Sequence, residues 1–314
     1  MGTTPNDYTY RHPIMEDLRA ALHIQRTAGI ADFGSSDLTE ETLQANWETG
    51  RTALDTDAWL VSAQDGTPVA YAEASQSNDP VWSVLWVLPE HRGEGIEDTL
   101  LHLAERRTLE HAASGVIRGR ASHTNLTVCR AYEQAGYSRY LSFQIMENRL
   151  NQLPPEPAWP AEISVRTFVP GLDEHITYEV DEEASEDKGY HSPLTFDGWA
   201  ERMGIHTPRF DPTLWFLAWR GPDLAGVALN YYDSESSTGW IDHLGVRRLW
   251  RKQGLGRSLL LHAFREFYQR RVPTVKLSVD SGSLTNAPRL YTRVGMEVVQ
   301  FYHIYRKELG PITS

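Results

Sequence analysis

The sequence has a single cysteine, Cys129, among its 314 residues. One cysteine cannot form a disulfide within the chain or a cysteine-based metal cluster, so we expect neither, and we expect no bound metal. No apolar run reaches the length of about 18 residues that a membrane-spanning helix needs. The first residues also lack the charged and then apolar layout of a secretory signal. These absences predict a cytoplasmic protein without membrane contact.

Lysine is absent from residues 1–150, and the whole chain carries a formal net charge of -12. Phosphate backbones repel such a protein, so we expect no nucleic-acid partner. An acidic protein can attract cationic amines, but a negative balance most often only keeps a protein soluble. Hydrophobic residues make up 40% of the chain and charged residues 23%, so the chain can bury a core and is not disordered by composition.

An internal repeat organises what is present. Arg251 lies 159 positions after Arg92, and Tyr291 lies 159 positions after Tyr132, each within a similar short segment. Landmarks that share one offset indicate two halves with one layout. Four prolines between residues 151 and 160 cannot continue a helix or a central strand, so this stretch is the expected linker.

We therefore expect two domains, at residues 1–150 and 161–314, joined by the linker at residues 151–160. Alternating apolar residues predict the strands, and apolar residues at helical spacing predict the helices, most clearly at residues 255–271. Both halves give the order β-α-α-β-β-β-α-β-α-β. This order predicts an α/β fold, in which a mixed sheet has helices on both faces.

The segment at residues 247–257 has the features of a polyanion site. A predicted strand ends just before it, and a predicted helix starts within it. Gly254 and Gly256 flank the helix start, where backbone N–H groups converge and the helix adds partial positive charge. Five basic residues and no acid lie in the segment: Arg247, Arg248, Arg251, Lys252 and Arg257. We interpret it as a pyrophosphate site; the alternative is a solvated basic loop.

These residues resemble the acetyl-coenzyme A (acetyl-CoA) signature of the GNAT superfamily of N-acetyltransferases, Gln/Arg-x-x-Gly-x-Gly/Ala, at Arg251, Gly254 and Gly256. Residues 287–296 (APRLYTRVGM) resemble the second landmark of that superfamily, a helix that carries Leu-Tyr-x-x-x-Gly-Phe, with Tyr291 at the tyrosine position. The resemblance covers the C-terminal half and, more faintly, the N-terminal half.

The resemblance implies two tandem GNAT-like domains, each with a mixed, mostly antiparallel sheet, flanking helices and a splayed acetyl-CoA cleft. In the C-terminal domain the cleft opens between the strands at residues 240–246 and 274–280. The first of these strands would bind the pantetheine arm, and the N–H groups of residues 253–257 would hold the pyrophosphate. The implied cofactor-binding residues are Leu244, Gly245, Val246, Arg251, Lys252, Gln253, Gly254, Leu255, Gly256, Arg257 and Ser283.

Ser283 is included because of a departure from the family. The family often has an asparagine seven or eight residues before the catalytic tyrosine, and here those positions are Leu284 and Ser283. Asn286 lies too close to the tyrosine to take this place. We therefore expect Ser283 to make the cofactor contact, or the contact to be absent.

The implied activity is the transfer of an acetyl group from acetyl-CoA, as cosubstrate, to a primary amine of a small molecule or peptide. Tyr291 matches the family's general acid; a phenol with a pKa of about 10 is protonated at neutral pH and can donate to the leaving thiolate. The alternative is a core aromatic. Asp242 and His243 are the candidate general bases, and as neighbours on a strand they point to opposite faces.

The N-terminal half departs from the signature. Glu97 stands where the signature has glycine or alanine, and Glu90, Glu94 and Asp98 lie nearby against one arginine, Arg92. Carboxylates at this place repel a phosphate. One residue does match the family: Asn125 lies seven residues before Tyr132. We expect the N-terminal domain to be degenerate, with a structural or substrate-shaping role.

The sequence says less about the substrate that accepts the acetyl group. The acidic segment at residues 179–191 is either a solvated helix face or a surface that holds a cationic amine. The tandem layout and length also resemble mycothiol synthase. From other classes, the chain could be a non-catalytic acyl-CoA sensor or a structural fold with a dead site. A sensor needs the phosphate cradle but not the acid, so Tyr291→Phe separates a sensor from an enzyme.

Overall fold

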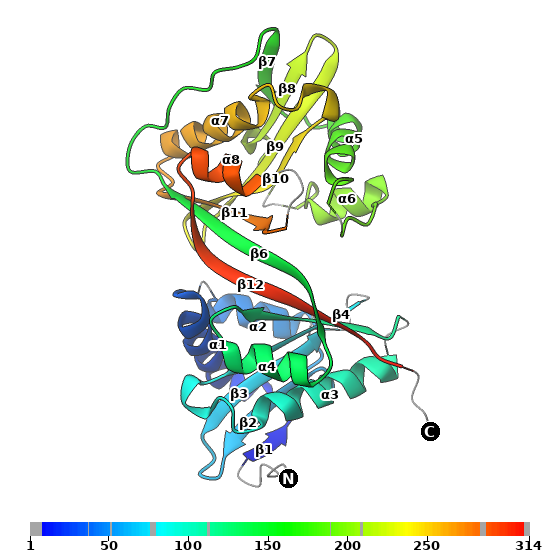
Figure 1. Cartoon of the computed structure of the whole chain (residues 1–314). Coiled ribbons are helices and arrows are strands. Elements are labelled where there is room, and N and C mark those ends of the chain that lie inside the picture. The colour runs from blue at the N-terminus through cyan, green and yellow to red at the C-terminus, as the bar shows by residue number, and fades with distance from the viewer. Residues whose placement is uncertain are drawn as a thin grey trace. The chain divides into compact units, whose positions relative to one another are not determined.

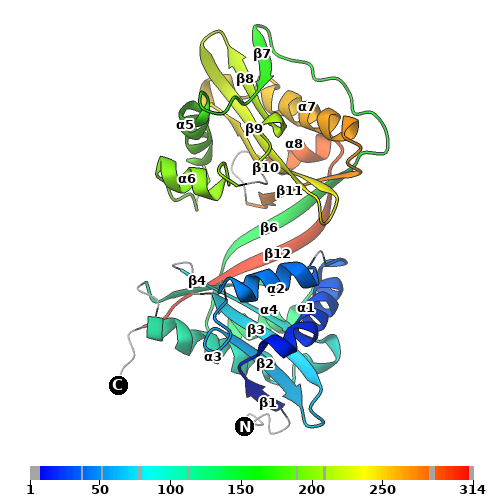
Figure 2. The ribbon, with the colours of Figure 1, turned by 180° about the vertical axis from the view of Figure 1, so that it is seen from behind.

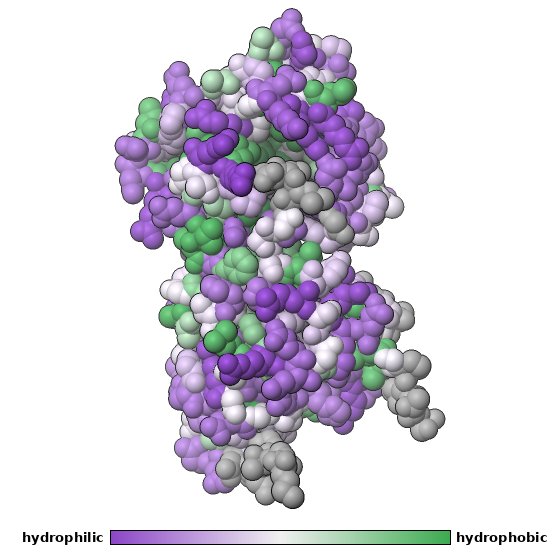
Figure 3. Space-filling model, viewed as in Figure 1, coloured by the Kyte–Doolittle hydropathy of each residue, from purple (hydrophilic) through white to green (hydrophobic). Residues whose placement is uncertain are grey.

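The computed structural model describes residues 8–36, 38–50, 52–75, 80–111, 114–188, 190–207, 210–282 and 287–310. The chain divides into two compact units. Unit 1 comprises Met1–Phe143 and Gln300–Ser314, and unit 2 comprises Gln144–Val299. Within the described residues, no helix has the length and apolar character needed to cross a membrane. On the face shown in Figure 3 hydrophilic residues predominate, as expected when the apolar side chains fill the cores.

All twelve described strands of the chain belong to one sheet, and those of unit 1 follow one another in the order β1-β2-β3-β4-β5-β12 (Figure 1). Its elements are β1 (Tyr8–Arg11), α1 (Leu18–Phe33), α2 (Glu40–Glu48), β2 (Ala58–Ala63), β3 (Pro68–Ser75), β4 (Val81–Val87), α3 (Ile96–His111), β5 (Val116–Ser122), α4 (Leu126–Gln134) and β12 (Glu297–Glu308). One core packs α3 and α4 on the sheet, and a second packs α1 and α2 on it. The sheet therefore has helices on both faces.

Unit 2 repeats this plan in the order β6-β11-β10-β9-β8-β7 (Figure 2). Its elements are β6 (Ser138–Arg149), which belongs to unit 2 from Gln144 on, β7 (Ile163–Thr167), α5 (Glu174–Ser185), α6 (Phe196–Arg202), β8 (Trp215–Arg220), β9 (Asp223–Asp233), β10 (Thr238–Val246), α7 (Leu255–Gln269), β11 (Thr274–Asp280) and α8 (Ala287–Arg293). The predicted helix at residues 255–271 is present and ends two residues earlier. The expected proline-rich stretch, residues 151–160, forms no helix or strand.

The alternation along β8 shows how one strand serves two cores. Trp215 and Leu217 pack with α5 and α6, whereas Phe216 and Ala218 pack with α7. Successive side chains of a strand point to opposite faces, so a strand buried on both sides must be apolar throughout. The predicted α/β fold, in which two similar units each have a mixed sheet with helices on both faces, is confirmed. The described strand pairs are antiparallel except for β4 with β5 and β10 with β11.

Two strands lie in the sheet of the other half of the sequence. The last strand, β12, pairs with β5 of unit 1, from Tyr302 opposite Ser122 to Glu308 opposite Val116. The strand β6, which follows the helices of the first half, neighbours β11 of unit 2. Apolar periodicity predicts both strands, but each pairs with a partner far away in sequence. Each unit therefore includes a strand that the other half of the sequence encodes.

Candidate active site

The strands β10 and β11 splay apart in unit 2. Their parallel pairing joins residues 238–240 to residues 274–276 and, in the described part of the chain, goes no further, although β10 continues to Val246 and β11 to Asp280. The other edge of β10 stays paired with β9 up to Val246. Backbone groups of a strand alternate between its two edges, so part of those in residues 241–246 face the side that β11 has left. The family resemblance predicts that the pantetheine arm binds along this edge of β10.

A β-bulge lies in the middle of β10. Ile241 pairs with Asn230 and His243 with the adjacent Leu229, so Asp242 is the extra residue. Without the bulge, His243 would share the face of Ile241, which belongs to the core under α7. With the bulge, His243 faces α5 instead. Asp242 is exposed.

The imidazole of His243 is held by a buried carboxylate. Its Nδ1 lies 2.8 Å from Oδ1 of Asp181 on α5, and the exposed fractions of the two side chains are 11% and 4%. The other carboxylate oxygen, Oδ2, accepts a hydrogen bond of 2.9 Å from Nε1 of Trp199. Burial acts to raise the pKa of the Asp181 carboxyl, but His243 and the Trp199 N–H outweigh it and lower that pKa. Asp181 is therefore ionised at neutral pH.

Tyr291 lies on α8 and is 9% exposed, within the core under α7. Burial, followed by the nearby Tyr190, raises the pKa of its phenol to about 12. The hydroxyl is therefore protonated across the physiological range and is available as a proton donor. Tyr190 belongs to the segment after α5, so the electrostatic contact brings that segment near Tyr291.

The loop before α7 forms a turn with N–H groups available to a ligand. Lys252 and Gly254 both have positive φ, at 62° and 88°, and Gly254 is the N-cap of α7. No side chain of the described residues caps this helix, and no acid lies in its first turn. Positive φ at alternate residues lets successive N–H groups point to one place, and the helix dipole adds positive potential there. These features are typical of an anion site, and the pyrophosphate site that the sequence indicates stays a prediction.

The predicted basic residues divide into two groups. Arg251 braces the loop, because its Nε donates to the Val246 carbonyl at 2.8 Å and its Nη1 contacts Asp187. Arg247 pairs with Glu183 at 2.7 Å, and Arg248 pairs with Asp187 at 2.9 Å. These arginines are therefore already neutralised by α5 and the residues that follow it.

Lys252 and Arg257 form the second group. Both are exposed, and the described part of the chain shows no ion pair to either. A phosphate could therefore bind these two cations without breaking an ion pair of the described residues.

The remaining predicted residues shape the loop. The Gln253 side chain donates to the Leu249 carbonyl at 3.1 Å, and Leu255 is buried in the core. Gly256 has room for a side chain, since a Cβ there would lie 3.5 Å from Leu290. Leu244 and Val246 contact the same core from β10. Ser283 lies outside the described residues.

Gly245 is required by packing. A Cβ at this position would lie 2.9 Å from the Cβ of Ala184 on α5, closer than such atoms approach. The helix α5 thus lies directly on β10 at Gly245, with Asp181 reaching His243 at one end of the contact and Glu183 reaching Arg247 at the other. One helix therefore touches both the candidate base and the cofactor loop.

The acidic segment does not have the free charge that an amine-holding surface needs. Asp181 is engaged by His243, Glu182 pairs with His191 at 3.2 Å, and Glu183 and Asp187 pair with the loop arginines. The sequence offered a solvated face or an amine-binding surface. In the structure these acids mostly bind cations of the protein itself, which local sequence does not reveal.

The equivalent cradle in unit 1 is filled by a side chain. Glu97 occupies the position of Gly256, is 2% exposed, and accepts hydrogen bonds of 3.3 Å at both carboxylate oxygens from the N–H of Gly93. Gly93 and Gly95 have the positive φ of Lys252 and Gly254. A carboxylate therefore stands where unit 2 leaves N–H groups for an anion.

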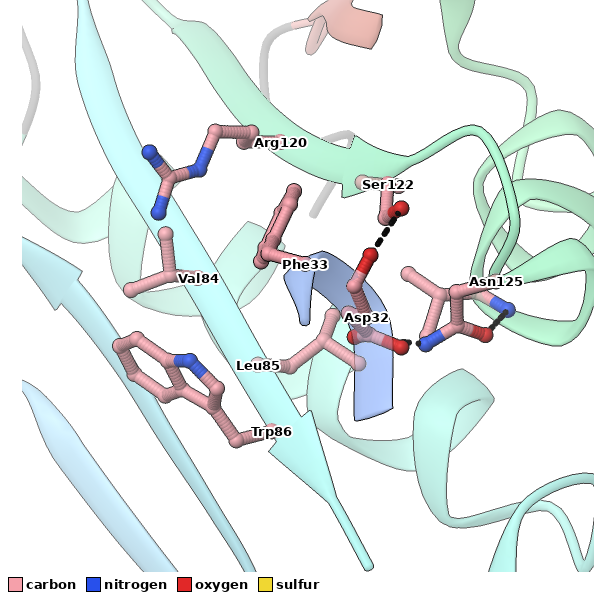
Figure 4. Close-up of a pocket in the computed structure, with 10 residues that line it drawn as sticks. Asp32, Phe33, Val84, Leu85, Trp86, Arg120, Ser122 and Asn125 are labelled. Atoms are coloured by element: carbon pink, nitrogen blue, oxygen red, sulfur yellow. Dashed lines mark hydrogen bonds between the residues drawn. The ribbon is translucent and has the colours of Figure 1, made fainter. Parts of the chain in front are cut away.

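The strands β4 and β5 of unit 1 also separate, but the space between them is small. The strands β4 and β5 pair only as far as Ser83 and Gly119 in the described residues, and the space beyond holds a cavity of about 20 Å³, room for one or two water molecules. Figure 4 shows Asp32 and Phe33 from α1 and Arg120 from β5 around it. The Asp32 carbonyl accepts a hydrogen bond of 2.7 Å from Ser122, which ties α1 to the end of β5. Tyr132, the counterpart of Tyr291, is fully buried.

Residues 18–137 and 177–296 match the Acetyltransferase (GNAT) family. The two matches lie one in each half of the repeat and together cover more than half of the chain. The protein therefore belongs to the GNAT family and is an acetyl-transferring enzyme. Enzymes of this family use acetyl-CoA. The resemblance carried by Arg251, Gly254 and Gly256 is confirmed, and the family match favours an enzyme over a cofactor sensor or a dead scaffold.

Several mycothiol acetyltransferases align with most of the chain. A mycothiol acetyltransferase of Catenulispora acidiphila is 28% identical over 305 residues, which cover 91% of this chain and 93% of the relative. A mycothiol acetyltransferase of Streptomyces scabiei is 31% identical over 250 residues, which cover 76% of each chain.

Solved structures show the same tandem architecture. The GCN5-related N-acetyltransferase from Sphaerobacter thermophilus is 35% identical, with a TM-score of 0.84 and coverage of 98% of this chain and 97% of that one. A tandem GNAT protein from the clavulanic acid biosynthesis pathway has a TM-score of 0.71 at 15% identity and covers 97% and 99%. The latter likeness concerns the fold alone.

Proposed function

We propose that unit 2 transfers an acetyl group from acetyl-CoA to a primary amine of a small molecule, and that unit 1 has lost this activity. The observation that carries the proposal is the difference between the two cradles. At the start of α7, Gly256 leaves the N–H groups open to a phosphate, whereas at the start of α3, Glu97 takes up the N–H of Gly93.

The cofactor site that we propose follows from the placement of each residue. Backbone groups of residues 244–246 on the open edge of β10 hold the pantetheine arm, and the N–H groups of residues 253–257 hold the pyrophosphate. Lys252 and Arg257, which form no ion pair with the described residues, add positive charge beside it. Arg251 acts mainly by bracing the loop against Val246, because its guanidinium is already engaged.

Acetyl-CoA supplies an activated acyl carbon, which a neutral amine can attack directly to form an amide and release the thiol. The role of this chain is to position the two substrates and to move two protons. A base must take one proton from the ammonium form of the acceptor before the attack. The Tyr291 hydroxyl gives its proton to the leaving thiolate and is restored by the second proton of the amine.

The acceptor proposed first is a small primary amine of unspecified skeleton. A mycothiol-type acceptor is the second candidate, because relatives named mycothiol acetyltransferase align with 76% or more of the chain. The identities, 28% and 31%, support the reaction class more strongly than the acceptor.

Calorimetry with acetyl-CoA tests the proposal. We expect the wild type to bind one equivalent and Gly254→Glu to bind none, because the new carboxylate enters the cradle. The matched control is Gly95→Glu, which adds the same side chain at the same positive φ in unit 1 and should leave binding unchanged. Two equivalents in the wild type, or loss of binding in the control variant, would contradict the assignment of the site to unit 2.

A screen of primary amines follows, with thiol release as the readout. The chain's one cysteine, Cys129, is buried and contributes little background. Acetylation of the mycothiol precursor amine in preference to other amines would support the second candidate. If no amine in a broad panel releases thiol while acetyl-CoA binds, the transfer proposal is wrong.

A further inference from the structure

We infer that His243 is the general base of the transfer and that Asp181 is its positioning residue, a role that nothing in the sequence assigns to that acid. The inference rests on the proposed function, since it names the group that takes the proton from the acceptor amine. The observations that carry it are the bulge in β10, the 2.8 Å contact between Nδ1 and Oδ1, and the Trp199 hydrogen bond.

The contact fixes which nitrogen carries the proton. An ionised carboxylate only accepts hydrogen bonds, so Nδ1 of His243 must be the donor to Asp181. In the neutral imidazole the other nitrogen, Nε2, then has a free lone pair and is the basic atom. The described residues provide no hydrogen bond to Nε2, and the ring is 11% exposed, so a substrate or a water molecule can reach it.

Both oxygens of the carboxylate are engaged, which holds its orientation. Oδ1 accepts from His243, and Oδ2 accepts from the Trp199 indole, which is itself 1% exposed. A buried carboxylate without such partners would be neutralised or would leave the site. Trp199 on α6 therefore supports the base through Asp181, one step removed from the reaction.

The proton balance is simple. The N–H bond of the acceptor ammonium breaks and an N–H bond forms at Nε2, which leaves the electron pair on the amine nitrogen for the new C–N bond. The imidazolium is stabilised by the Asp181 carboxylate until it returns the proton to solvent. The fixed charges around Asp181 and the adjacent segment are Glu182, Lys188, Arg202 and Asp242.

Asp242 is the competing candidate from the sequence. It is the bulged residue and it is exposed. No hydrogen bond fixes its carboxylate among the described residues, and an exposed Asp is a weak base at neutral pH. The bulge thus separates the two neighbours: it turns His243 towards Asp181 and leaves Asp242 at the surface.

The first test reads the tautomer directly and needs no acceptor. Nitrogen NMR of the full chain labelled at histidine should show a protonated Nδ1 and an unprotonated Nε2 for one ring, assigned by its loss in His243→Gln. In Asp181→Asn the amide N–H donates to Nδ1, so the proton should move to Nε2. A protonated Nε2 in the wild type, or an unchanged tautomer in Asp181→Asn, would overturn the inference.

The second test uses the most active amine of the panel. Asp181→Asn should lower kcat by about 100-fold or more, with acetyl-CoA binding unchanged. Asp242→Asn should leave the rate close to that of the wild type.

The matched control is Asp173→Asn. Asp173 is also buried in unit 2, at the start of α5, and pairs with Arg166 at 2.7 Å. This variant should lose stability and keep the wild-type tautomer of His243, so it reports what a merely structural carboxylate does. Equal behaviour of the two variants would refute the positioning role. Loss of acetyl-CoA binding in the wild type would instead refute the proposed function and leave the tautomer result standing.

Discussion

Glu97 and Gly93 close the cradle of unit 1 with two hydrogen bonds of 3.3 Å between the carboxylate and one backbone N–H. The helix start of α3 is thus capped by its own side chain. In unit 2 the equivalent helix start has no such cap in the described residues. A capped start stabilises the protein, while an open one leaves donors for a ligand.

This contact predicts a pH-dependent effect of Glu97→Gln. Burial raises the pKa of the Glu97 carboxyl, so the folded state holds its proton more tightly than the unfolded chain. The wild type therefore loses stability as the pH rises from about 4.3, the usual Glu value, through the raised value. We expect the free energy of unfolding of Glu97→Gln, relative to the wild type, to increase between about pH 4 and about pH 7.

Urea denaturation at both pH values measures the effect. Glu94→Gln is the control for the substitution itself, because Glu94 is exposed in the same turn. A flat difference for Glu97→Gln would mean that the carboxylate is not penalised by burial.

A second prediction concerns Tyr291→Phe. Loss of the hydroxyl should lower kcat by about 100-fold or more, because the thiolate leaves without its proton. Acetyl-CoA affinity should be unchanged. Since burial raises the pKa of the Tyr291 phenol to about 12, wild-type activity should show no alkaline loss from this group below about pH 11.

The counterpart in unit 1 provides the control for this prediction. The Tyr132 hydroxyl is buried without a hydrogen-bond partner in the described residues. Tyr132→Phe should therefore leave kcat unchanged and should not reduce stability. Steady-state kinetics of both variants decide the matter, and an equal loss in the two would argue against an acid role for Tyr291.

A third prediction tests the packing of α5 on β10. Gly245→Ala should lower the free energy of unfolding by about 1–3 kcal/mol, because the new Cβ would lie 2.9 Å from Ala184. Gly256→Ala adds the same methyl group with an ordinary 3.5 Å contact to Leu290 and should change stability little. Chemical denaturation of the two variants compares them, and similar losses would exclude the close contact as the cause.

The fourth prediction separates strain from charge at Lys252. A lysine with a φ of 62° is strained by about 1–2 kcal/mol relative to glycine. Lys252→Gly should raise the melting temperature, whereas Lys252→Ala keeps the strain and should not. Both variants lose one cation beside the cradle, so both should weaken acetyl-CoA binding by the same factor, more at low salt than at high salt. Different losses of affinity would show that the lysine acts through loop shape.

Sequence predicted the parts of the site that depend on local pattern. Gly254 and Gly256 at a strand–loop–helix junction indicate a phosphate cradle, and the offset of 159 between Tyr132 and Tyr291 indicates the tandem repeat. Glu97, at the position in the first half that is equivalent to Gly256, predicts that the first half lacks an open cradle. The structure adds the contact of Glu97 with Gly93.

Sequence could not predict the contacts between distant segments. Asp181 and His243 are 62 positions apart, and nothing in the acidic run around Asp181 indicates from sequence alone that this residue is buried. The bulge at Asp242 is also invisible, because one extra residue does not disturb an apolar pattern that is short and mixed. The ion pairs of Glu183 and Asp187 with the loop arginines follow from the same long-range packing.

The placement of β6 and β12 has a consequence for how this gene can change. The first half of the sequence encodes β6, which lies beside β11 of unit 2. The second half encodes β12, which pairs with β5 of unit 1. Deleting either half would leave a bare sheet edge in the survivor, the kind of edge that drives aggregation. Selection for the acetyl transfer that we propose for unit 2 would therefore also preserve the other half of the sequence.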